Sequence, residues 1–124
     1  MDVALWIVAG LAGLVFFLAG FLKLTKPWNE LHEQMPWTVD VTAAQVKLIG
    51  VAELLGGLGL ILPGAFDTAT WLTPVAAAGL VLTMAVAAAM HRRRGDGPEN
   101  LLLNAILGGM AFVVLVGRTV IETL

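Results

Sequence analysis

Four long apolar runs constrain this chain more than any other feature of its sequence. They span residues 3–22, 43–62, 71–90 and 98–117. A helix rises about 1.5 Å per residue and needs about 20 apolar residues to cross the hydrocarbon core of a bilayer, so each run has the length of a membrane span. Hydrophobic residues make up 59% of the chain and charged residues only 13%, against about a quarter in soluble domains. We therefore predict an integral membrane protein in a lipid bilayer.

The four runs predict helices rather than strands. None of them alternates between apolar and polar residues with the period of two that a membrane β-strand shows. The connections at residues 63–70 and 91–97 are short, so consecutive helices should be antiparallel neighbours. The predicted fold is all-α, a transmembrane four-helix bundle that forms a single domain over residues 1–124. Pro63 and Gly64 are expected to end the second helix.

The first connection, residues 23–41, is longer and more polar than the others. Trp28 and Trp37 are placed like the aromatic anchors that lie at a membrane surface. The segment fits a short amphipathic helix in the interface and, equally, a loop. The apolar run before it is expected to stay as a span rather than to be removed as a signal peptide. Asp2 stands where such a peptide carries basic residues, and no A-x-A cleavage site follows.

The basic residues gather on one side of the predicted bundle. The first and third connections and their flanks hold Lys23, Lys26, Lys47, Arg92, Arg93 and Arg94, and the opposite side holds only Arg118. The positive-inside rule then predicts that both connections lie in the cytoplasm and both termini outside. A net charge of −2 argues against nucleic acid as a partner, because nucleic-acid-binding surfaces are basic.

Glu53 is the outstanding exception to the apolar rule inside the spans. It lies about nine residues into the second run, roughly 14 Å deep at 1.5 Å per residue. A carboxylate at that depth costs at least about 2.5 kcal/mol on insertion scales, so it should face other polar groups. Gly50, Gly56 and Gly57 share its helix face, and small residues mark the face where membrane helices pack closely. Glu53 is therefore predicted to point into the bundle.

Other polar residues follow small-residue faces toward the same, cytoplasmic end: Lys23, Gln45, His91, Asn100 and Asn104. Together with Glu53 they predict a polar ligand-binding pocket between the helices. A purely structural interpretation stays open, in which Glu53 bonds to Asn104 or Lys23 only to hold the helices together. Lys23, near a helix end, could also extend its ammonium to the membrane surface. With no cysteine and two histidines, no metal site is expected.

Short motifs in all four runs resemble those of the DoxX-like family of small bacterial membrane proteins. They are G-F-L-K-L (Gly20–Leu24), K-L-I-G-V-A-E-L-L-G (Lys47–Gly56), a third run ending in His91, and P-E-N-L-L-L-N (Pro98–Asn104). The resemblance implies a four-helix bundle in the bacterial cytoplasmic membrane and a link to membrane redox chemistry and the quinone pool. It also implies that Lys23, Glu53, His91 and the asparagines of the fourth run are the recurring polar positions. Where relatives rely on cysteines, this chain has none, so a redox role would need a bound quinone or a partner enzyme.

Three functions remain open at this point. The first is an accessory or redox-linked membrane subunit that holds a lipophilic or quinone-like ligand beside Glu53. The second is a stand-alone membrane enzyme in which Glu53 and His91 act as an acid/base pair on a hydrophobic substrate, the two being candidate catalytic residues. The third is a helix-docking chaperone or assembly protein, which would require the glycine-lined faces to lie on the outside of the bundle.

Overall fold

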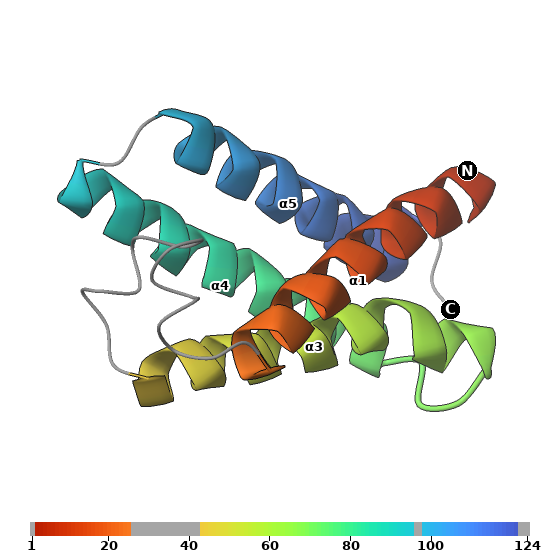
Figure 1. Ribbon diagram of the computed structural model, residues 1–124. Coiled ribbons are helices and arrows are strands. Elements are labelled where there is room, and N and C mark those ends of the chain that lie inside the picture. The colour runs from red at the N-terminus through yellow and green to blue at the C-terminus, as the bar shows by residue number, and fades with distance from the viewer. Residues whose placement is uncertain (1, 26–42, 96–97, 122–124) are drawn as a thin grey trace.

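A computed structural model describes residues 2–25, 43–95 and 98–121 of the chain, and these residues form long helices (Figure 1). The elements are α1 (Asp2–Thr25), α3 (Ala43–Ala65), α4 (Leu72–Arg94), α5 (Pro98–Val116) and a short π-helix, η2 (Gly117–Ile121), which continues α5. The described residues contain no β-strand. The all-α prediction is confirmed.

Each of the four long helices is long and apolar enough to cross a bilayer. The apolar segments are Val3–Thr25, Ala44–Ala65, Leu72–Arg93 and Leu101–Val120, so all four reach three residues beyond the predicted C-terminal ends. The multi-pass membrane four-helix bundle is thus confirmed. The predicted interfacial helix falls mostly on residues 26–42, which lie outside the described part of the chain.

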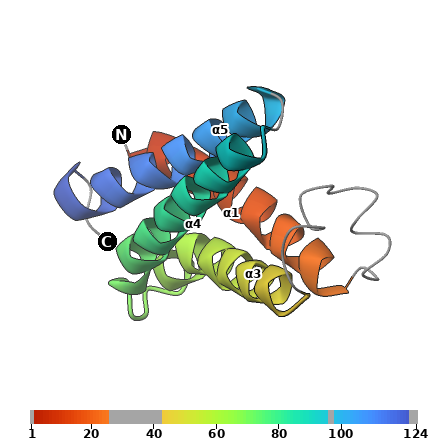
Figure 2. The same cartoon turned by 90° about the vertical axis from the view of Figure 1, so that its left-hand side faces the viewer.

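The helices form two antiparallel pairs, α1 with α3 and α4 with α5 (Figure 1). The α3–α4 turn links the two pairs. Two perpendicular views show that the pairs diverge with increasing distance from that turn (Figures 1 and 2). The pairs are furthest apart where α1 and α4 end and α3 and α5 begin, which we call the open end of the bundle. Side chains near the centre of the bundle fill the space between the pairs, with Phe16, Leu60 and Leu80 almost fully buried.

Glycines hold α1 directly against α3. A methyl group added to Gly57 would lie 2.5 Å from the carbonyl oxygen of Gly13, and one added to Gly20 would meet the carbonyl oxygen of Gly50. No side chain fits between the helices at these two levels, so the backbones themselves are in contact. The two glycines on each helix are seven residues apart, which keeps both on one face. Gly50 and Gly57 of the predicted small-residue face therefore contact α1, whereas Gly56 of the same face contacts Leu80 of α4.

At the opposite end from the opening, α1 contacts the C-terminal part of the chain. Gly117 packs against the side chain of Leu5. The guanidinium of Arg118 lies over the Trp6 ring, 5.0 Å from its centroid, and the Arg118 side chain is buried. A cation over an aromatic face is attracted by the negative face of the ring, and the attraction grows when water is excluded. This contact closes the bundle at the end away from the cavity described below.

The prediction that Pro63 and Gly64 end the second helix is wrong. Helix α3 continues through Pro63 to Ala65. Proline lacks an N–H, so the carbonyl of Gly59 loses its usual partner four residues later. The hydroxyl of Thr73, from α4, donates to that carbonyl at 2.9 Å. A neighbouring helix thus satisfies the carbonyl that proline leaves without a donor, and the helix can continue in an apolar surrounding.

Thr73→Val should therefore destabilise the bundle by about 1–2 kcal/mol, because the Gly59 carbonyl would be buried without a donor. In a Pro63→Ala background the same substitution should cost much less, since the new backbone N–H at position 63 can bond to Gly59. Unfolding by sodium dodecyl sulfate in mixed micelles measures both differences. Equal losses in the two backgrounds would show that the hydroxyl does not replace the missing N–H.

Candidate functional site

An ion pair between Lys23 and Glu53 lies inside the bundle toward its open end. The Lys23 Nζ atom is 2.7 Å from Glu53 Oε1. Glu53 is 2% exposed and Lys23 is 8% exposed, so both charged residues are buried. Burying a charge in an apolar bundle is unfavourable, and the opposite charge of the partner is the main interaction that offsets this cost for each residue. The contact is one that the purely structural interpretation of Glu53 predicts.

The direction of helical side chains explains why the two residues meet. Side chains on a helix lean toward its N-terminus. Lys23 therefore extends inward from the last turn of α1, and Glu53 leans outward from the middle of α3. The close approach at Gly50 aids this, because a methyl group there would lie 3.0 Å from the Lys23 Cβ. Lys23 could have extended its ammonium to the membrane surface, but it turns toward Glu53 instead.

A cavity of about 590 Å³ lies beside the ion pair and touches all four long helices. Eleven of its sixteen lining residues are apolar, so its wall suits a lipophilic molecule. The lining residues are Ala19 and Lys23 of α1; Leu48, Ile49, Ala52 and Glu53 of α3; Leu82, Thr83, Met84, Val86, Ala87, Met90 and His91 of α4; and Leu103, Asn104 and Leu107 of α5.

Two further polar residues reach the cavity from the second helix pair. His91, in the last turn of α4, is buried at 6% exposure. Asn104 of α5 also lines the cavity, and its Nδ2 atom is buried without a hydrogen-bond acceptor among the described residues. Buried amide groups are normally paired, so an amide donor beside an apolar cavity is a natural partner for an oxygen acceptor of a ligand. The hydroxyl of Thr83, by contrast, already donates to the Gly79 carbonyl at 2.8 Å.

Four of the six predicted site residues thus border one cavity: Lys23, Glu53, His91 and Asn104. Gln45 is exposed and does not line it. The next residue, Val46, is fully buried, and adjacent helical residues point about 100° apart, so Gln45 turns away from the bundle. Asn100 lies in the first turn of α5, but its side chain falls outside the part of the chain that the structure describes.

Sequence reasoning missed two kinds of residue. The apolar wall of the cavity carries no signal that separates it from an ordinary lipid-facing or core surface. Arg118 was noted only as the single basic residue on its side, whereas its side chain is buried over Trp6. The burial of Arg118 could have been predicted from its position within the last apolar segment, because ionisable residues in such segments usually face the interior of the bundle. In the described ranges, no three histidine, cysteine or acidic side chains come together as a metal site.

Comparison with known families agrees with these features. A model of the DoxX-like family matches residues 7–114, which include the whole of α3 and α4 and most of α1 and α5. The matched range contains the ion pair and every residue that lines the cavity. Neither the curated proteins nor the solved structures contain a match to the chain.

Proposed function

Because the chain belongs to the DoxX-like family, we propose that it is an accessory or redox-linked membrane subunit that binds a lipophilic, quinone-like ligand in this cavity. The observation that carries the proposal is the Asn104 amide, which lies buried in the cavity wall with no acceptor for Nδ2 among the described residues. A protein that used these polar groups only to join its helices would pair the amide internally. The volume of about 590 Å³ is in the range of small-molecule sites.

The polar side chains match the needs of a compact head group with oxygen acceptors. Lys23 and Asn104 carry N–H donors, whereas an ionised Glu53 carries only acceptors. The ligand oxygens would therefore bond to Lys23 and Asn104, and Glu53 would act as a positioning residue that holds the Lys23 ammonium inside the bundle. His91 borders the same cavity and would contact the head group from α4.

Asn104→Leu tests the proposal, because leucine has the same number and branching of side-chain heavy atoms as asparagine but no donor. We expect the affinity for decylubiquinone, measured by equilibrium binding to protein in nanodiscs, to fall about tenfold, which corresponds to the loss of one hydrogen bond of about 1–1.5 kcal/mol. The stability of the ligand-free protein should stay unchanged or rise, because a buried amide without a partner is removed.

Thr83→Val is the matched control. Thr83 also lines the cavity, but its hydroxyl is used by Gly79, so binding should stay within about twofold of that of the unsubstituted protein. If Asn104→Leu binds normally and is less stable, the amide serves the fold and the proposed ligand site is wrong. If the unsubstituted protein binds no quinone, the proposed function fails as a whole.

A second candidate function is a membrane enzyme in which Glu53 and His91 act together on a hydrophobic substrate. It is supported by one observation, which is that both residues border the same cavity. The contact of Glu53 with Lys23 makes this candidate weaker, because the carboxylate already has an ionic partner. Conversion of a lipid-extract component by the purified protein, lost in His91→Gln, would favour it over the binding function.

The helix-docking alternative has less support. Gly13, Gly20, Gly50 and Gly57 are used within the bundle, where α1 packs on α3. Glycines with no atom near their added methyl position do exist at Gly10, Gly79 and Gly109. They are scattered over three helices and do not include the glycines beside Glu53 that motivated this alternative. The glycine faces therefore favour a bundle that packs on itself.

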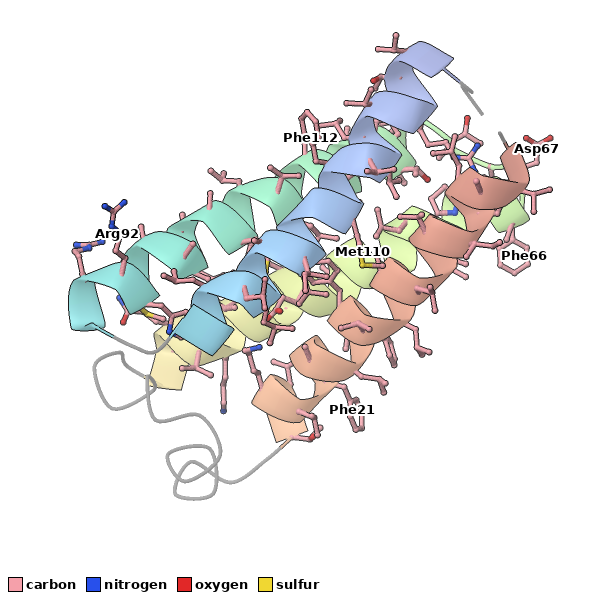
Figure 3. The ribbon with its side chains drawn as sticks, turned by 90° about the horizontal axis from the view of Figure 1, so that it is seen from above. Phe21, Phe66, Asp67, Arg92, Met110 and Phe112 are labelled. Carbon is pink, nitrogen blue, oxygen red and sulfur yellow. The ribbon has the colours of Figure 1, made fainter. Side chains whose placement is uncertain are left out.

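We further propose that the open end faces the cytoplasm. The exposed Lys47, Arg92 and Arg93 lie at this end, and Figure 3 shows Arg92 pointing away from the bundle. The positive-inside rule places such residues on the cytoplasmic side. Because the chain has no cysteine, single substitutions can report the orientation directly. In right-side-out vesicles, an impermeant maleimide should label Asp67→Cys and spare Arg93→Cys, and the reverse pattern would invert the assignment.

A further inference from the structure

The wall of the cavity includes side chains that face outward as well as inward. Leu48 is 71% exposed, Leu82 is 66% exposed and Val86 is 60% exposed, and all three line the cavity. In a membrane-spanning bundle, exposed apolar side chains of this kind face the acyl chains of lipids. The cavity is therefore continuous with the lipid-facing surface, mainly at α3 and α4 and also at Leu103 of α5, which is 54% exposed.

The polar part of the cavity lies on the other side of this wall. Lys23, Glu53 and His91 are all buried, although they line the same space. The cavity thus changes from charged and polar beside the ion pair to mainly apolar at the surface between α3 and α4. A molecule that fits this gradient has a compact polar head and an apolar tail.

The depth of the opening points to lipid rather than water as the source of the ligand. Ala52 lies five residues deeper in α3 than the exposed Lys47, and Val86 lies six residues deeper in α4 than the exposed Arg92, which is about 8 and 9 Å along the helix axes. The exposed charges of Lys47 and Arg92 lie nearer the open end and mark the membrane surface. The opening between α3 and α4 is therefore at the depth of the hydrocarbon core.

We propose that the cavity opens sideways into the bilayer between α3 and α4, and that it takes a single-tailed amphiphile from the lipid, with the head beside Lys23 and Asn104 and the tail extending past Val86. This inference rests on the proposed ligand-binding function and specifies its ligand class and route of access. It predicts that amphiphiles of the bilayer, rather than water-soluble metabolites, are the ligands.

Val86→Trp tests the opening, with Val75→Trp as its matched control. Both valines are exposed on α4, at 60% and 57%, but only Val86 lines the cavity. The two probes are decylubiquinone and the same dimethoxy-methyl-benzoquinone ring without its tail. Val86→Trp should weaken the tailed probe at least tenfold relative to the tailless ring, because the indole would occupy the path of the tail. Val75→Trp should leave the ratio of the two dissociation constants unchanged.

Leu48→Trp, on the α3 side of the opening, provides a second variant should Val86→Trp disturb the head site. It should raise the same ratio by a similar factor. A ratio that stays constant in both variants would overturn the lateral opening, while binding of the tailless ring would still support the proposed function. Failure of the unsubstituted protein to bind either probe would overturn both proposals, so the two failures can be told apart.

Discussion

Gly57→Ala should destabilise the protein by about 3 kcal/mol or more, although it adds only one methyl group. That methyl would lie 2.5 Å from the Gly13 carbonyl oxygen and 2.8 Å from the Phe17 backbone nitrogen. Overpacked side chains can change rotamer, which limits the usual cost to about 1–3 kcal/mol, but backbone atoms can yield only if the helices separate. Titration with sodium dodecyl sulfate in mixed micelles measures the loss of unfolding free energy.

Gly10→Ala is the control for this prediction. Gly10 lies on α1 within the same bundle, but no atom comes within 4 Å of the position that its methyl would occupy. Alanine is the better helix former, so this substitution should leave stability unchanged or raise it by up to about 1 kcal/mol. Equal losses in Gly10→Ala and Gly57→Ala would mean that loss of glycine itself, rather than helix contact, causes the effect.

Lys23→Met should cost about 3–5 kcal/mol of stability, because it leaves the Glu53 carboxylate buried without its cation. Glu53→Gln should cost less. Lys23 lies two residues before the end of α1, so its ammonium can swing to the membrane surface once released, whereas Glu53 lies ten residues into α3 and cannot. The two single variants are therefore expected to be unequal, with the lysine variant the more damaged.

The double variant Lys23→Met, Glu53→Gln distinguishes the interaction between the two side chains from the separate effect of each substitution. It should recover most of the loss of Lys23→Met, because no net charge remains buried. Lys47→Met, at an exposed lysine of α3, should have little effect and controls for the loss of a basic residue. Additive losses in the double variant would show that Lys23 and Glu53 do not stabilise one another.

The fold was largely readable from the sequence, since the length of apolar runs is a strong constraint in a membrane. The position of Glu53 was readable for the same reason, because its cost in hydrocarbon leaves one direction for its side chain. Pro63 was misread because the hydroxyl that compensates for it comes from Thr73, on another helix. A sequence shows that a carbonyl loses its local donor but not which neighbouring helix supplies another.

The candidate site was readable only in part. Gln45 lies at the same end of the bundle as the other polar residues. It is exposed, however, because it precedes the buried Val46 and adjacent residues of a helix point in different directions. Phase within one helix could have excluded it. The partner of Glu53 could not be decided, because Lys23 and Asn104 were both in reach, and the choice depends on how closely Gly20 and Gly50 let α1 approach α3. The separation of the two helix pairs, which makes room for the cavity, leaves no trace in residue patterns.

The outward-facing part of the cavity wall, at Leu48, Leu82 and Val86, has a consequence for how affinity is defined. In a bilayer or micelle this surface is always in contact with acyl or detergent chains, so these chains compete with the tail of the ligand for the same position. Occupancy would then follow the mole fraction of ligand among the lipids rather than its concentration in water. Changing the chain length or unsaturation of the host lipids should shift the apparent affinity even when the protein and the ligand stay the same.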